Sequence, residues 1–324
     1  MFGIDRQVYY RKIKRTTIKQ NKAKEVVLMV NDLRQLMPRI GARKLYYLLL
    51  DQLHLMKIGR DKFFDILRAN HLLVQPKRSY HITTNSHHRF RKHKNRILDL
   101  EINRPEQVWV SDITYIGKRE NPCYLSLITD AYSKKIMGYY VAENLNTQSS
   151  LRALKMALKQ RTHNTLTLIH HSDRGLQYCA HEYQKELMKN KVLCSMTQNS
   201  DPYENAIAER INGILKQEFM IDKYHQKRKI TNLIIKESIN IYNNLRPHYS
   251  NYMLTPNQMH SQNQIQMRRY KNKKQLQEGS CNCLINYFYV IICIAFLGRD
   301  KNCFYFTASN ILSAISACPF SVVI

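Results

Sequence analysis

The order of regular segments between residues 106 and 219 limits the fold of this chain more than any other feature. Runs rich in β-branched and aromatic residues predict three successive strands joined by short connections, over residues 107–116, 124–133 and 135–144. Helices and strands then alternate, and their patterns predict segments over residues 147–160, 166–173, 180–190, 192–196 and 201–219. Three meandering strands followed by this alternation predict an α/β domain in which helices flank a mixed five-stranded sheet.

Two of the predicted strands carry an aspartate where an apolar residue is expected. Asp112 interrupts the apolar run of the first strand, and Asp173 stands at the end of the strand over residues 166–173. An isolated ionised carboxylate in an apolar setting costs several kcal/mol or more unless a cation pairs with it. Two interpretations of Asp173 are therefore open: it begins a turn, or it helps to hold a metal ion.

The last predicted helix carries a third acid. Its start is typical of a capped helix, with Asp201 before Pro202 and with Glu204 completing a capping box. At the helical period, one side of this helix gathers Ile207, Ile211, Ile214 and Leu215. The opposite side gathers Asn205, Glu209, Asn212 and Lys216. If the isoleucines pack on the core, Glu209 faces away from them, and the alternative is an ordinary polar face exposed to solvent.

The charge of the chain indicates its partner. The 51 Lys and Arg residues outnumber the 24 Asp and Glu residues, which gives a formal net charge of +27. Of these, 23 basic and 7 acidic residues lie within the first 100 positions. So strong a positive charge attracts polyanions, and nucleic acid is the partner that we expect from it. The alternative is a basic surface without a partner.

The cysteines and the apolar runs argue against several other classes of protein. The eight cysteines include no CxxC pair, so we expect neither a zinc site nor a disulfide framework, and we expect a reducing cytoplasm. The charged first residues do not resemble a secretory signal. The apolar run over residues 284–297 is shorter than the roughly 18 residues that a membrane span needs.

Short helices are predicted over residues 24–75, with a connection between them that ends in Gly59. Two helices joined by a short turn that contains glycine suggest a helix-turn-helix module over residues 1–75. The second helix would meet DNA through Arg60, Lys62 and Arg68. An ordinary helical hairpin is the alternative.

A basic linker is predicted over residues 76–105. Its first part is rich in Lys, Arg and His and shows no apolar periodicity. We expect the linker to lie along DNA phosphates through residues that include Arg91 and Lys92. Contacts of this kind give an affinity that depends on salt but not on the DNA sequence.

Several stretches of the chain together resemble one family. The motifs "WVSDITYI", "HHSDRGLQY", "ENAIAERINGILKQE" and "YNNLRPHYSNYMLTP" are similar to OrfB-type transposases of bacterial insertion sequences, which are related to retroviral integrases. The resemblance runs from about residue 2 to about residue 260. Its most specific part is the 35-residue gap between Asp173 and Glu209, followed by a basic residue, Lys216, seven positions further on.

This resemblance implies a ribonuclease-H-like catalytic core over residues 106–265. In that core Asp112, Asp173 and Glu209 would bind two Mg²⁺ ions, for which Mn²⁺ is an expected substitute. Hard Mg²⁺ prefers carboxylate and phosphate oxygens. Two such ions, about 3.5–4 Å apart, stabilise both the attacking and the leaving oxygen of a phosphodiester exchange. The resemblance also implies that Lys216 contacts a phosphate of the element's end.

The function expected on these grounds is that of a transposase, which nicks DNA at the ends of its element and uses the freed 3′ hydroxyl to attack another phosphodiester. The expected partners are double-stranded DNA, further copies of the chain on that DNA and a protein from the upstream reading frame, with no membrane involved. Two alternatives are a nuclease on the same fold and a DNA-binding regulator without catalytic activity. We assign no role to residues 266–324, and we expect that ending the chain after about Gln277 improves solubility without changing strand transfer.

Overall fold

The computed structural model describes residues 5–75, 93–97, 100–117, 122–198, 205–223 and 228–267. The chain divides into two compact units, Met1–Arg268 and Arg269–Ile324, and every described residue belongs to the first. Among the described residues, no helix is both long and apolar enough to cross a membrane.

A five-stranded sheet forms the centre of the domain that follows residue 100. Its strands are β1 Val108–Ile116, β2 Cys123–Asp130, β3 Ile136–Ala142, β4 Leu168–Ser172 and β5 Val192–Met196. The strand order is β3-β2-β1-β4-β5. The first three strands pair antiparallel, whereas β4 pairs parallel with β1 and β5 pairs parallel with β4. This arrangement confirms the mixed five-stranded sheet that the order of segments predicts.

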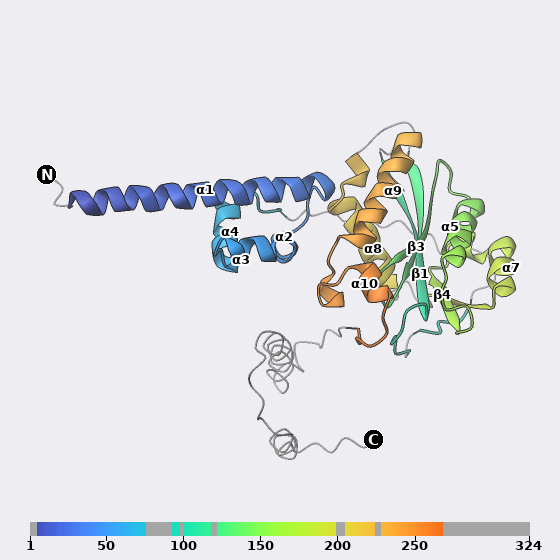
Figure 1. Ribbon diagram of the computed structural model, residues 1–324. Helices are drawn as coiled ribbons and strands as arrows, with labels where there is room; N and C mark the ends of the chain where they lie inside the picture. Colours follow the sequence, from blue (N-terminus) through green and yellow to red (C-terminus); the bar gives the residue numbers. More distant parts are fainter. Residues whose placement is uncertain are drawn as a thin grey trace, which may run out of the picture. The chain divides into compact units, whose positions relative to one another are not determined.

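Helices cover both faces of the sheet (Figure 1). The helices of this domain are α5 Thr147–Lys159, α6 Leu176–Cys179, α7 His181–Lys189, α8 Ala206–Gln217, α9 Arg228–Asn244 and α10 Pro256–His260. One apolar cluster joins Trp109 of β1 to Leu154 of α5 and Tyr183 of α7. Helix α5 packs tightly on β3 because Gly138 has no side chain: a Cβ there would lie 2.2 Å from the Ala153 carbonyl oxygen. The other face of the sheet is covered by α8 and α9.

Helix α8 begins later than its sequence pattern predicts. The helix starts at Ala206 with Asn205 as its N-cap residue, and not at the predicted residue 201. The residues of the predicted cap, Asp201, Pro202 and Glu204, lie outside the described residues. The Asn205 side chain makes no capping bond, and its amide donates to the Ser111 carbonyl oxygen of β1 at 3.2 Å. The start of α8 is therefore tied to the sheet.

The N-terminal segment is entirely helical. It contains α1 Arg6–Leu36, α2 Ala42–Leu48, α3 Leu50–Leu55 and α4 Arg60–Ala69. The short helices predicted within residues 24–75 match α2 to α4, and Gly59 is the N-cap residue of α4 as expected for a connection. The 31-residue α1 was not predicted, because only Val26 and Val30 of it are buried and the rest shows no apolar stripe. The helix-turn-helix assignment itself stays a prediction.

A largely buried charge cluster connects the N-terminal helices to the domain that contains the sheet. Glu218 is the C-cap residue of α8, and its carboxylate accepts a bond of 2.6 Å from Lys44 of α2. Both carboxylate oxygens also accept from the Arg246 guanidinium, each at 2.8 Å, and Arg246 is 2% exposed. The Glu218 carbonyl oxygen accepts from the Arg39 backbone N–H at 3.0 Å. We call Lys44, Glu218 and Arg246 the Glu218 cluster.

The last turn of α9 and the segment that follows it brace the same domain. The Asn243 side chain bonds both the N–H and the carbonyl oxygen of Ile136, each at 3.0 Å. The Asn251 amide donates to the Ser133 carbonyl oxygen at 2.6 Å. Together with Arg246, these contacts show that the motif "YNNLRPHYSNYMLTP" braces the edge of the core.

Candidate active site

The two aspartates lie on adjacent parallel strands at matching positions. Ser111 of β1 pairs with Ser172 of β4, so Asp112 and Asp173 each follow directly after this pair. Neighbouring strands are about 4.8 Å apart. The sheet therefore brings together two acids that are far apart in the sequence, at the carboxyl end of the paired stretch.

Helix α8 brings the third acid to this end of the sheet. The Asn212 amide donates to Asp112 Oδ2 at 2.7 Å, and Asn205 donates to the carbonyl oxygen of Ser111 beside it. Glu209 lies between these two asparagines on the same face of α8 and is exposed. The isoleucine stripe predicted to face the core does so through Ile211 and Ile214, both buried.

The electrostatics of the three acids are linked. Burial, the charge of Asp173 and, to a smaller extent, the charge of Glu209 together raise the pKa of Asp112 to about 7. Bonds from Asn212 and from the Ile113 backbone N–H oppose this rise. Burial and the charge of Asp173 also raise the pKa of Glu209. A like charge close by disfavours ionisation, so each of these acids lies within electrostatic reach of another.

Asp173 also organises the turn after β4. Its Oδ1 accepts from the Gly175 backbone N–H at 3.1 Å, and a Cβ at Gly175 would meet the same oxygen at 3.0 Å. Arg174 Nε donates to the Thr197 carbonyl oxygen at 2.5 Å, which ties the turn to the end of β5. The first interpretation of Asp173, that it begins a turn, is therefore confirmed, and the turn does not exclude the second.

The donor chemistry of the site fits a hard divalent cation. All three acids offer oxygen ligands of the kind that Mg²⁺ prefers. Their mutual repulsion, seen in the raised pKa of Asp112, is what a bound cation relieves. In the part of the chain that the structure describes, no three Asp, Glu, His or Cys side chains are gathered closely enough to hold a metal ion. The aspartates are instead bonded to Asn212 and Gly175.

Lys216 lies on α8 near the acids. Its Nζ is 4.3 Å from the centre of the Tyr115 ring, a cation–π contact. Burial lowers the pKa of Lys216, while the charges of Asp222 and Asp112 oppose this change. The Lys216 ammonium, for which a phosphate contact is predicted, is thus half-buried and lies against an aromatic ring of β1.

The other predicted DNA contacts lie away from the acids. Arg60, Lys62 and Arg68 are all exposed on α4. Arg60 Nε is 3.1 Å from Asp61 Oδ1, and Arg68 is 2.6 Å from Asp65 Oδ1. Exposed pairs of this kind contribute little, so the arginines stay available to a phosphate. Arg91 and Lys92 lie outside the described residues.

Two site residues escaped the sequence analysis, namely Asn205 and Asn212. Both are buried, and both connect α8 to β1 at Ser111 and Asp112. The available signal was their position on the same helix face as Glu209. The histidines before Asp173 are structural: His170 bonds the Tyr183 hydroxyl at 2.9 Å, and His171 bonds the Ser195 hydroxyl at 2.9 Å.

Comparisons with known proteins agree with this architecture. Two family models described as "Integrase core domain" match residues 102–202 and 190–256. The "Transposase for insertion sequence element IS629" of Shigella sonnei is 34% identical over 143 residues, which are 44% of this chain and 48% of that protein. The "Insertion element IS600 uncharacterized 31 kDa protein" of Shigella sonnei is 31% identical over 252 residues, which are 76% of this chain and 92% of that protein. The chain belongs to the insertion-sequence transposases with an integrase core.

For this transposase, the family predicted from the sequence motifs is thus confirmed. The first matched segment contains Asp112 and Asp173, and the second contains Glu209 and Lys216. A solved structure, the HTLV-2 integrase catalytic core domain in complex with magnesium, is 18% identical with a TM-score of 0.39 and covers 48% of this chain and 97% of that chain.

Proposed function

We propose that this transposase cleaves DNA at the ends of its element and joins the freed 3′ hydroxyl to a second phosphodiester, using Asp112, Asp173 and Glu209 as the ligands of two Mg²⁺ ions. The observation that carries the proposal is that the three acids lie at one end of the sheet and that the charge of one raises the pKa of another. Parallel pairing of β1 and β4 aligns the two aspartates, and α8 adds a glutamate whose pKa responds to Asp173. Polynucleotidyl transfer is the chemistry of integrase core domains, and the family supports it.

The chain's own residues have distinct roles in this proposal. Asp112 and Asp173 present oxygens from a rigid sheet, and Asn212 fixes the orientation of Asp112 through a 2.7 Å bond. Glu209, on the exposed face of α8, completes the ligand set from the helix side. Bound Mg²⁺ would supply activation of the attacking oxygen and stabilisation of the leaving oxygen. Lys216, two turns along α8, would hold a phosphate of the element's end.

DNA recognition is proposed for the helical segment. The exposed residues Arg60, Lys62 and Arg68 of α4 would contact DNA, and the linker residues Arg91 and Lys92 would follow its phosphates. We propose further that several copies of the chain assemble on the DNA, in the bacterial cytoplasm on the nucleoid, with a protein from the upstream reading frame as an additional partner. Mn²⁺ would replace Mg²⁺ in vitro.

The decisive experiment uses the full chain and labelled DNA that carries the short inverted repeats flanking its gene. Asp112→Asn, Asp173→Asn and Glu209→Gln should each abolish nicking and joining while DNA binding persists. Glu237→Gln, which changes an exposed glutamate on α9, is the matched control and should retain full activity. Cleavage by any one of the three site variants at the wild-type rate would contradict the assignment.

The same assay separates the two alternative functions. A nuclease would nick the labelled DNA without joining it to a second molecule. A catalytically inactive regulator would bind the repeats but neither nick nor join them with Mg²⁺ or Mn²⁺ present. Either result would replace the proposed function, whereas joining that depends on all three acids would support it.

A further inference from the structure

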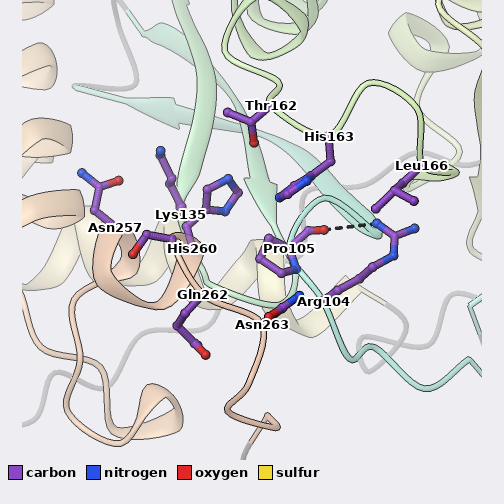
Figure 2. A pocket seen from close by; sticks show the side chains of 11 residues that line it. Arg104, Pro105, Lys135, Thr162, His163, Leu166, Asn257, His260, Gln262 and Asn263 are labelled. Carbon is purple, nitrogen blue, oxygen red and sulfur yellow. Dashed lines mark hydrogen bonds between the residues drawn. The ribbon is translucent and has the colours of Figure 1, made fainter.

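A cavity lies at the opposite end of the sheet from the acids. It has a volume of about 630 Å³ and lies among the segment before β1, the β2–β3 turn, the loop before β4 and α10 (Figure 2). Arg104 and Leu166, which line it, precede the first residues of β1 and β4. Asp112 and Asp173 follow the last paired residues of the same strands. The cavity is therefore separate from the candidate active site.

The side chains around this cavity bring positive charge. Figure 2 shows the rings of His163 and His260 between Lys135 and Arg104. Within the described residues, the Lys135 ammonium makes no hydrogen bond or ion pair, and neither does the His163 ring. The Arg104 guanidinium is oriented by two backbone carbonyl oxygens, of Pro105 at 3.2 Å and Thr167 at 2.6 Å, and no described carboxylate pairs with it.

Two buried acids lie beneath the cavity, but they are already bound internally. Glu106 accepts backbone bonds from Thr162 at 2.8 Å and His163 at 2.7 Å. His260 lies between the acids, with Nε2 3.5 Å from Glu106 and Nδ1 3.8 Å from Asp130.

Arg161 adds a second cation, with Nε 3.9 Å from Glu106 Oε2. Asp130 accepts from the Glu106 backbone N–H at 2.7 Å and from both the N–H and the hydroxyl of Ser133 at 2.7 Å. The acids beneath the cavity are therefore already in contact with His260 and Arg161, and their charges also act on Lys135. Within the described residues the Lys135 ammonium still makes no direct hydrogen bond or ion pair, so its N–H groups, like those of Arg104 that do not bond Pro105 or Thr167, can be donated to a ligand.

We propose that this cavity binds a phosphate group of a DNA strand. A guanidinium held in place by the backbone and an ammonium without a partner are the donors that phosphate recognition uses. The cavity would hold DNA at a point remote from the reacting bond. That DNA supplies the phosphate rests on the proposed function, whereas the binding of a phosphate anion does not.

The test measures how the affinity of the full chain for a duplex depends on salt. Each phosphate contact contributes roughly 0.9 to the slope of log K against log salt concentration. Lys135→Gln should therefore lower the magnitude of this slope by about one unit, and Lys135→Arg should restore it. Lys185→Gln, which removes an exposed lysine on α7, is the matched control and should leave the slope unchanged. Equal slopes for Lys135→Gln and wild type would overturn the proposal.

A second arm distinguishes DNA from free phosphate. Inorganic phosphate, compared with chloride at equal ionic strength, should raise the melting temperature of the wild type but not of Lys135→Gln, since a ligand stabilises the state that binds it. If phosphate stabilises through Lys135 while the DNA slope does not change, the ligand is a free anion and the DNA assignment is wrong. When Lys135→Gln is added to Asp112→Asn or to Glu209→Gln, the slope of log K against log salt concentration should change by the same amount as in the wild type. A failure of the proposed chemistry is thereby separated from a failure of the cavity.

Discussion

At the scale of single residues, the candidate site depends on an asparagine as much as on its acids. Asn212 is buried, and its amide is one of two donors that the structure gives to the Asp112 carboxylate. Without this donor, a half-buried carboxylate next to Asp173 would lose the main bond that offsets its burial. The asparagine therefore orients the Asp112 carboxylate and favours its ionised form.

Asn212→Ala should slow strand cleavage strongly while the protein remains folded. The loss of the amide leaves Asp112 with one donor fewer, and removing a bond to a buried group costs about 1–3 kcal/mol. Cleavage rates measured over a range of Mg²⁺ concentrations should show a higher Mg²⁺ requirement. Asn240→Ala, on the exposed face of α9, serves as the control. An unchanged Mg²⁺ requirement would show that Asn212 does not orient the site.

The environment of Glu106 predicts how the free energy of unfolding depends on pH in acid. Burial tends to raise its pKa, but bonds from His260, Thr162 and His163 outweigh this and hold the pKa at about 2, against an ordinary value of 4.5. A pKa lowered by folding contributes stability that is present above the unfolded value and is lost as the pH falls toward the folded value. Roughly 3 kcal/mol should disappear between about pH 4.5 and pH 2.

Unfolding by denaturant at a series of pH values checks this. Glu106→Gln should be less stable than the wild type at pH 7, because its amide faces the Thr162 and His163 N–H donors. The variant should also lose less stability on acidification than the wild type does. An acid dependence identical to that of the wild type would contradict the role of Glu106.

At the scale of elements, helix α8 is fixed at both ends. Asn205 and Asn212 tie its first half to β1, and Glu218 at its C-cap is held by Arg246 and Lys44. Burial and neighbouring cations lower the pKa of Lys44 to about 8, although Glu218 opposes this change by stabilising the charged ammonium. Arg246 thus contributes more to holding the helix end than Lys44 does, because it bonds both carboxylate oxygens.

Arg246→Ala should destabilise the protein by about 3–5 kcal/mol, since it leaves the largely buried Glu218 carboxylate without its bidentate partner. Lys44→Met should cost much less, because Glu218 keeps the arginine and the methionine fills the same space. Denaturant midpoints of the two variants provide the comparison. Equal losses for both variants would mean that the arginine is not the dominant partner.

The elements differ in how well the sequence predicts them. The strands with apolar runs bounded by turns were found close to their true limits, and β5 was found at its exact residues. Helix α1 was missed because most of it faces solvent and so carries no periodic apolar signal. The Glu218 cluster could not be predicted, since Lys44 and Glu218 are 174 positions apart and nothing local marks either one as paired. Asp112 and Asp173 were singled out because each stands in or at the end of an apolar run, and Glu209 because its spacing from Asp173 resembles that of the family. Asn205 and Asn212 fitted a polar face and carried no such signal.

At the scale of the whole molecule, the net charge of +27 makes binding to DNA strong and unselective unless particular residues read the ends. Arg60→Ala combined with Lys62→Ala in the full chain should reduce the preference for terminal over random DNA, because both side chains are exposed on α4. Competition binding with the two DNAs measures this preference. Lys185→Ala, which removes an exposed lysine on α7, is the control and should leave the affinity for both DNAs unchanged. A preference that survives the double change would remove α4 from the recognition surface.

The Glu218 cluster has a consequence for how such proteins can diversify. Exchange of N-terminal segments between relatives would be a direct route to new end specificities. Here, however, a segment that lacks a cation at position 44 would leave Glu218 with fewer donors, and one that places a bulky group there would press on Arg246. We therefore expect the helical segment and the core to be inherited together. A grafted N-terminal segment should give a folded protein only when it includes a residue that can bond Glu218 as Lys44 does.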